Sequence, residues 1–443
     1  MTQGDKSFPE LQTHILLAGN LTITASSQST LYPPIHLRGP SGTIHTLLCG
    51  SPTHKAPTQI TALALDQSPP THTHNLHLAS FLSTGEFTIF IINHTTPSTS
   101  TRKLTYVPTI RNARTAPIIQ AVFHQPLLIT LSKTFNLSIY DLSGDSVVHC
   151  QTLTSFTSYQ PSSLVLSTPS PATYRLVLAY AISVYPAHWS VGATELIISG
   201  PVTNQDPSPS PSSTPLVDDP PLTVMTTRTT RAIDVPQGWI DENKLRSMRE
   251  QWGRKVERVA DIQTDGKWVV LAPAGIPRRD ISSTPSSPAH SSSSASSSSP
   301  GPSSSPIHTR SFNAASSLYS PTHLQLYRLH LPSSTSTSTL LTSPKLTFIR
   351  TLHGQTGCIS ALSLADGRCV SLSANGSIWV WDLEVGTGAE VARPSGSGSL
   401  SDDGQEGEDG LAWNGGEKGT VVFDERRIIS AGAGSVQVRR FDV

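Results

Sequence analysis

The sequence contains few of the residues that carry chemistry or cross-link small folds. Four cysteines occur in 443 residues, and no two of them form a Cys-x-x-Cys pair. Zinc sites and disulfide frameworks need close or patterned cysteines, so we expect buried, reduced thiols. The sequence has no phosphate-binding loop, nucleophile elbow or zinc-protease histidine pair, and acidic residues are sparse in its first 200 positions. We therefore expect no catalytic site, metal or cofactor.

Charge of either sign is also scarce. Charged residues make up 14% of the chain, and 31 basic residues balance 31 acidic ones. This balance argues against a protein that binds nucleic acid or anionic membranes through bulk charge. No apolar run approaches the roughly 20 residues that span a bilayer, and the N-terminus lacks the apolar core of a signal peptide. We expect a soluble protein, cytoplasmic or nuclear, that binds neither nucleic acid nor membranes.

What the chain does have is a set of apolar strands joined by tight turns. In the clearest case, the run 368–374 leads into a turn at Asn375-Gly376, and a second strand follows that closes on Trp381-Asp382. This hairpin resembles the central hairpin of a blade in the WD-repeat family. The resemblance implies a β-propeller, because a four-stranded blade has no second face to bury unless further blades stack beside it.

Similar hairpins recur about every 40 to 50 residues, and Phe90, Tyr140 and Tyr327 stand in the place of Trp381. This aromatic residue is expected to fill the wedge between neighbouring blades, where Phe, Tyr and Trp can exchange. The corresponding hairpins and further strands are expected at 42–47 (a third strand of the first blade), 78–90, 127–142, 174–198, 267–329 and 427–441. The repeat predicts an all-β chain that forms a single β-propeller over residues 1–443. Seven blades are predicted, with six or eight as the alternatives; the competing fold is a β-sandwich.

The last predicted strand, 435–441, would leave the outer edge of its blade unpaired. Propellers are commonly closed by a strand from the other end of the chain. We therefore expect 14–18 or 21–24 to pair beside 435–441.

Three segments interrupt the strands and have too little apolar content to offset the entropy lost on ordering. Residues 203–221 are rich in Pro and Ser, residues 280–317 are nearly pure Ser and Pro, and residues 394–417 are rich in Gly and Ser with an acidic run at 402–409. We expect all three to be disordered loops, which are tolerated because the cost of loop closure grows only logarithmically with length.

One segment, 239–259, predicts an inserted amphipathic helix. Its apolar stripe at helical spacing is Leu245, Met248, Trp252, Val256 and Val259. Two interpretations are open. The helix packs on the rim of the ring with a solvated basic face, or it docks a partner through Arg249, Trp252, Arg254 and Lys255, whose acidic counterpart could be the 402–409 run of the same chain.

The resemblance to WD-repeat proteins is strongest over 352–383 and weaker over 77–92 and 127–142. The sequence departs from the family at His353-Gly354, which reverses the usual Gly-His order, and at Asn375, which replaces the turn Asp. These changes put the family's His–Asp hydrogen-bond network in question.

The resemblance implies a non-catalytic protein–protein interaction scaffold or adaptor. A narrower hypothesis is a substrate-recognition subunit of a cullin-type (SCF) ubiquitin ligase that binds a ligase adaptor, since residues 8–16 are similar to the opening of an F-box; that match is either coincidental or the remnant of a lost F-box. The alternative is a propeller-fold enzyme, a hydrolase or lyase, with its site at the central channel.

Overall fold

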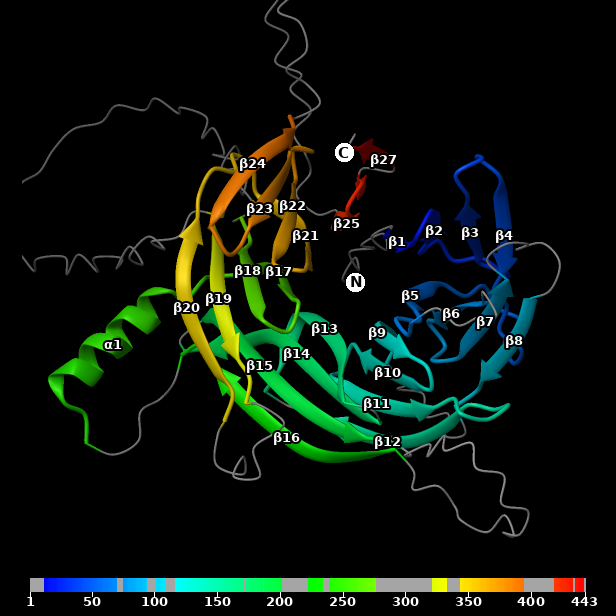
Figure 1. The fold of residues 1–443 in the computed structure, drawn as a ribbon, viewed down its shortest axis with the longest axis horizontal. Coiled ribbons are helices and arrows are strands. Elements are labelled where there is room, and N and C mark those ends of the chain that lie inside the picture. The colour runs from blue at the N-terminus through cyan, green and yellow to red at the C-terminus, as the bar shows by residue number, and fades with distance from the viewer. Residues whose placement is uncertain are drawn as a thin grey trace, which may run out of the picture.

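Seven antiparallel sheets stand around a central axis in a computed structural model of the chain (Figure 1). The structure describes residues 12–69, 75–93, 101–108, 116–155, 157–170, 172–185, 187–200, 222–233, 239–275, 321–332, 343–393, 418–432 and 435–441.

The strands follow one another along the chain, sheet by sheet. The first sheet holds β1 (Thr13–Ala18), β2 (Leu21–Ser26), β3 (Pro34–Arg38) and β4 (Ile44–Leu48). The second holds β5 (Ile60–Leu65), β6 (Asn75–Leu82), β7 (Phe87–Asn93) and β8 (Thr101–Tyr106). The third holds β9 (Ile118–His124), β10 (Leu127–Ser132), β11 (Asn136–Asp141) and β12 (Val148–Thr154). The fourth holds β13 (Tyr159–Ser170), β14 (Thr173–Val184), β15 (His188–Ser199) and β16 (Thr223–Arg231).

Helix α1 (Glu242–Gly253) precedes the fifth sheet, which holds β17 (Val259–Thr264), β18 (Trp268–Pro273), β19 (Leu324–His330) and β20 (Lys345–Leu352). The sixth holds β21 (Ile359–Ala365), β22 (Arg368–Ser373), β23 (Ile378–Asp382) and β24 (Thr387–Ala392). The seventh has three strands, β25 (Thr420–Phe423), β26 (Arg427–Gly432) and β27 (Ser435–Arg440).

The first strands of the sheets line the centre and contact one another in a closed cycle: β1, β5, β9, β13, β17, β21, β25 and again β1. Each sheet is therefore a blade, and the chain is an all-β, seven-bladed β-propeller, as the repeat spacing predicted. Seven hydrophobic clusters hold it together, one between each pair of neighbouring blades.

The aromatic residues at the equivalent blade position have the role predicted for them. Phe90, Tyr140, Tyr327 and Trp381 are all buried, and each lies in the cluster that joins its blade to the preceding one. Each side chain therefore fills the wedge between two neighbouring sheets, and the interchange of ring types is tolerated because all four are large and apolar.

Two predictions about the first blade were wrong. The segment 42–47 does not form a third strand, because β4 is the fourth strand of its blade, paired with β3. Neither 14–18 nor 21–24 pairs beside β27: β1 pairs with β2, and β2 with β3. The physical reason is local, since the turn at Gly19, where φ is +54°, folds β1 back onto β2.

The predicted helix exists but is shorter than 239–259. Asp241 caps its N-terminus through a hydrogen bond from the Lys244 amide to Oδ1 at 2.7 Å, and the helix ends at Gly253. Val256, which had been placed on the helical stripe, is buried beyond the helix, where its backbone pairs with that of Trp189. Val259 starts β17. The helix in the described part of the chain is too short and too polar to cross a membrane.

The inserts at 203–221, 280–317 and 394–417 lie outside the described residues. All four cysteines are free, as predicted, but not all are buried: Cys49 and Cys369 are, whereas Cys150 is half-buried and Cys358 is exposed. Burial raises the pKa of the Cys49 thiol to about 11, so that thiol is protonated at neutral pH.

Candidate functional site

The seam between the seventh and the first blade differs from the other interfaces of the ring. Its hydrophobic cluster consists of three buried residues, Ile15, Ile429 and Ala431, with Leu17 and Val422 packed against them. Each of the other six clusters contains at least seven buried residues. These two blades therefore pack near the centre of the ring and separate further out.

The alternation of residues on β2 and β3 explains the separation. Successive side chains of a strand point to opposite faces of the sheet. One face of the first blade carries Ile23, Ala25, Ile35 and Leu37, all buried in the cluster shared with the second blade. The opposite face carries Thr22, Thr24, His36 and Arg38, which line the side toward the seventh blade. A polar face of this kind cannot form a dry interface like those between the other blades.

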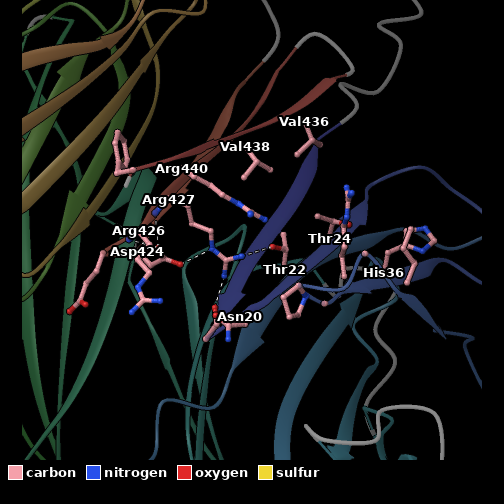
Figure 2. A pocket seen from close by; sticks show the side chains of 18 residues that line it. Asn20, Thr22, Thr24, His36, Asp424, Arg426, Arg427, Val436, Val438 and Arg440 are labelled. Atoms are coloured by element: carbon pink, nitrogen blue, oxygen red, sulfur yellow. Dashed lines mark hydrogen bonds and ion pairs between the residues drawn. The ribbon is translucent and has the colours of Figure 1, made fainter. Parts of the chain in front are cut away.

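An open cleft of about 1280 Å³ lies between these two blades. Figure 2 shows Thr22, Thr24 and His36 on one wall, and Val436, Val438 and Arg440 of β27 on the other. Val436 and Val438 are 48% and 49% exposed, and Phe441, just after the strand, is 38% exposed. The cleft therefore combines a polar wall with a wall formed by an apolar strand.

One arginine ties the two walls together at the inner end of the cleft. The Arg427 guanidinium donates a hydrogen bond to Thr22 Oγ1 at 3.2 Å (Figure 2). It also donates to the Gly19 carbonyl at 2.5 Å and to the Leu21 carbonyl at 3.4 Å. Asp424 holds this side chain in place, with Oδ2 2.8 Å from Arg427 Nε. Burial opposes the charge on Asp424, but the hydrogen bonds from Arg427 and from the amides of Arg426 and Arg427 prevail and hold the pKa of Asp424 below its usual value.

The charges in the cleft do not cancel. Arg38, Arg426 and Arg440 line it together with Glu425, while Arg427 and Asp424 are paired with each other. Among the described residues, no ion pair joins any of these three arginines to a carboxylate. Among the described lining residues, three unpaired guanidinium groups thus face the cleft against the one carboxylate of Glu425, and this charge favours an anionic group.

The residues predicted from the sequence to dock a partner lie far from this cleft along the chain, on α1 and just after it. Arg249 is exposed and Trp252 is half-buried. The Arg254 guanidinium lies 4.3 Å from the Phe348 ring and 3.9 Å from Glu250, which fixes it against β20. Lys255 is half-buried, and its amide donates to the Trp252 carbonyl. The structure thus brings these four residues together in one segment at the periphery of the ring (Figure 1), but leaves only Arg249 fully exposed.

Sequence reasoning missed the seam cleft altogether. A signal was present: in 22–38, Thr, His and Arg alternate with Ile, Ala and Leu, so that one face of both strands is polar. That pattern resembles an ordinary half-exposed sheet, and only the closed ring shows that the polar face looks onto another blade. The described residues contain no group of three or more His, Cys, Asp or Glu that could hold a metal ion.

Searches against protein-family profiles and against curated protein sequences find no match. Solved structures do match along the whole length of the chain. The computationally designed Ika8 protein is 12% identical, with 98% of both chains covered and a TM-score of 0.38. The β-propeller domain of Cps50 (Swd1) from Myceliophteria thermophila is 9% identical, with 99% of this chain and 100% of that chain covered and a TM-score of 0.42. With both TM-scores below 0.5, the propeller assignment rests on the strand order and pairing of this chain.

Proposed function

We propose that this protein is a non-catalytic interaction scaffold of the WD-repeat type, and that its seam cleft is a docking surface for other proteins. One observation carries the proposal: the ring leaves a cleft whose wall is a strand with alternating exposed apolar side chains, Val436 and Val438, beside uncompensated arginines. Exposed apolar groups next to a charged rim are typical of protein-binding surfaces.

The test compares proteins captured by the full chain with those captured by two surface variants. In the first, Val438→Asp places a carboxylate on the cleft wall; in the matched control, Met225→Asp makes the same kind of change on β16, where Met225 is 66% exposed. Quantitative mass spectrometry after affinity purification should show partners that are retained by Met225→Asp and depleted with Val438→Asp. Equal recovery of every captured protein by both variants would contradict docking at the seam.

The narrower ubiquitin-ligase hypothesis needs its own test. Residues 8–11 of the F-box-like segment lie outside the described residues, and 13–16 belong to strand β1. An F-box is built from helices, so this strand disfavours the F-box interpretation of 13–16. Pull-down of a purified cullin-ligase adaptor by the full chain would support the ligase role, and no recovery of the adaptor at micromolar concentration would remove it.

A second docking element is the α1 segment, because Trp239 before the helix is 87% exposed and Arg249 on it is exposed. Arg249→Glu is expected to leave the fold intact and to deplete a set of partners different from the one lost with Val438→Asp. If Arg249→Glu captures the same proteins as the unchanged chain, α1 is a structural helix that packs on the rim of the ring with a solvated basic face.

A further inference from the structure

Strand β27 is the outer strand of the one three-stranded blade in the described part of the ring. Two outer strands of complete blades are protected by their composition: β8 reads Thr-Arg-Lys-Leu-Thr-Tyr, and β16 is mostly Thr and Arg. Charged and polar residues of this kind discourage the pairing of another chain with a free edge. In β27, Val436 and Val438 instead stand at alternate positions in the half of the strand before its two arginines.

The direction of the backbone groups on β27 follows from its pairing. The Phe441 amide donates to the Arg426 carbonyl at 2.8 Å, so the backbone polar groups of Phe441 point toward β26. The register between β26 and β27 is regular, and in an antiparallel pair these groups alternate from side to side. The amides and carbonyls of Val436, Val438 and Arg440 are therefore directed away from β26, toward the open edge.

The side chains along this edge alternate as well. Val436, Val438 and Arg440 line the seam cleft, while Gln437 and Arg439 point to the other face of the blade, toward the sixth blade. Arg439 donates to Gln437 Oε1 at 3.3 Å, and its Nε is buried without a hydrogen-bond partner. Both faces of the strand thus end in an arginine.

A second groove lies on that other face, between the sixth and seventh blades. It has a volume of about 470 Å³ and shares Asp424, Glu425 and Phe441 with the seam cleft. This groove reaches the β27 end of the blade only at Phe441, just after the strand, so the seam cleft is the space that lies open beside Val436, Val438 and Arg440. Where a segment pairs with an edge strand, main-chain pairing supplies the affinity and alternate pockets supply the specificity.

Resting on the proposed docking function, we propose that β27 receives an extended acidic segment of a partner protein, which adds to the last blade as its fourth, antiparallel strand. Apolar side chains of the partner pair with Val436 and Val438 on the cleft face. Carboxylates pair with Arg440 on the same face and with Arg439 on the other. Cross-strand pairs of this kind stabilise a sheet, and the surplus of arginine in the cleft selects an acidic segment over a basic one.

The probe for this proposal is a fluorescent peptide of about eight residues, an ordinary strand length, containing Glu-Glu-Val-Thr-Val. In antiparallel pairing its two glutamates meet Arg440 and Arg439, and its two valines meet Val438 and Val436. Two matched peptides carry Gln-Gln in place of Glu-Glu, or proline in place of the first valine. Fluorescence anisotropy with the full chain should show saturable, salt-sensitive binding of the first peptide, with both controls weaker by about tenfold or more.

Two protein variants locate the site. Val438→Pro removes one amide that points to the open edge, and proline is tolerated on the free side of an edge strand. The matched control is Thr227→Pro on β16; Ala232 donates to the Val191 carbonyl, so the regular alternation directs the Thr227 amide outward in the same way. Val438→Pro should weaken binding about tenfold, and Thr227→Pro should leave it unchanged. Arg440→Glu should reject the glutamate peptide and accept a Lys-Lys version.

Strand addition would be overturned if the proline-containing peptide bound as tightly as the first peptide. It would also be overturned if Val438→Pro and Thr227→Pro weakened peptide binding equally. If the peptide does not bind, the proposal that a partner protein supplies the fourth strand is wrong, and a segment of this chain or a second copy occupies the edge. Light scattering identifies the second copy if it shows a dimer that Val438→Pro converts to a monomer. If the peptide does not bind while captured partners still depend on Val438, strand addition is wrong and the scaffold function stands. If the peptide binds and no partner is depleted by Val438→Asp, strand addition stands and the proposed docking of partners at the seam is wrong.

Discussion

At the residue scale, the sixth blade, which contains Trp381 and Asp382, has a buried hydrogen-bond network that was not predicted from the sequence. Trp381 Nε1 donates to Ser371 Oγ at 2.9 Å, and Ser371 Oγ donates to Gln355 Oε1 at 2.7 Å. Gln355 Nε2 continues the chain to Ser373 Oγ. All four side chains are buried. Gln355, one residue after the reversed His353-Gly354 pair, thus lies at the centre of this network. Asn375 Oδ1 touches the network only through the amide of Ser377, whose hydroxyl donates to Ser373 Oγ.

Replacement of Gln355 by leucine should therefore destabilise the protein although the two side chains are similar in size. The change leaves Ser371 and Ser373 buried with fewer hydrogen-bond partners, at an expected cost of about 1–3 kcal/mol. Chemical denaturation measures this cost. Ser360→Ala is the control, because its hydroxyl makes a single bond to the Leu372 carbonyl outside the network. A Gln355→Leu variant as stable as the control would show that the network contributes nothing.

At the element scale, the Arg427 side chain joins β26 to the turn between β1 and β2. Arg427→Ala removes three hydrogen bonds to the first blade and one to Asp424, all from a charged donor, and we expect a loss of about 2–3 kcal/mol, concentrated at the seam. Hydrogen exchange measured by mass spectrometry should quicken in β1 and β26 and stay unchanged in the third and fourth blades. Arg426→Ala is the matched control, since the neighbouring arginine lines the same cleft. Uniform quickening around the ring would contradict a local role.

The ion pair between Asp424 and Arg427 predicts that the stability of the protein depends on pH. The pKa of Asp424 is lowered in the folded protein, so its contribution to stability is complete above its unfolded pKa of about 3.9 and is lost as the pH falls through the folded value. The stability difference between the unchanged chain and Asp424→Asn should therefore be present at neutral pH, about 1 kcal/mol or less for a partly exposed pair, and disappear once the pH has fallen below the folded pKa of Asp424. Thermal melts across this range measure it, and a difference that persists in acid would contradict the assignment.

The elements show how far sequence reasoning reaches. The hairpin at 368–382 and its relatives could be located because alternation, turn residues and a buried aromatic are all local signals. The helix was predicted to run six residues too far at its C-terminal end, because Val256 and Val259 continue a helical spacing by coincidence and the helix ends at Gly253 before them. The seam cleft could not be predicted, since it depends on which face of β2 meets which face of β26 about 400 residues away, and a single sequence carries no signal for that meeting.

At the scale of the whole molecule, β18 and β19 pair directly, with Trp268 opposite Arg328, although β18 ends at Pro273 and β19 begins only at Leu324. The fold of the fifth blade therefore does not require the Ser/Pro-rich segment between them. Replacement of 280–317 by a short Gly/Ser linker should leave the fold intact and raise its stability by about 1 kcal/mol, because a shorter loop costs less entropy to close. Circular dichroism and chemical denaturation check this. A scrambled segment of the same length should behave like the original, and failure of the shortened protein to fold would show that the segment has a structural role.

The small seam also determines the order in which this ring can form. Contacts within each blade, and between successive blades, join residues that are close in sequence, whereas the contact between Arg427 and Gly19 spans 408 positions. Long-range contacts form slowly because the entropy of a large loop must be lost before any contact energy is gained. During synthesis the first six blades can stack as each leaves the ribosome, and the first blade waits with its polar face in water. The polar face formed by Thr22, Thr24, His36 and Arg38 can remain in water until the seventh blade has folded. An apolar face at the same place would promote aggregation of the incomplete ring.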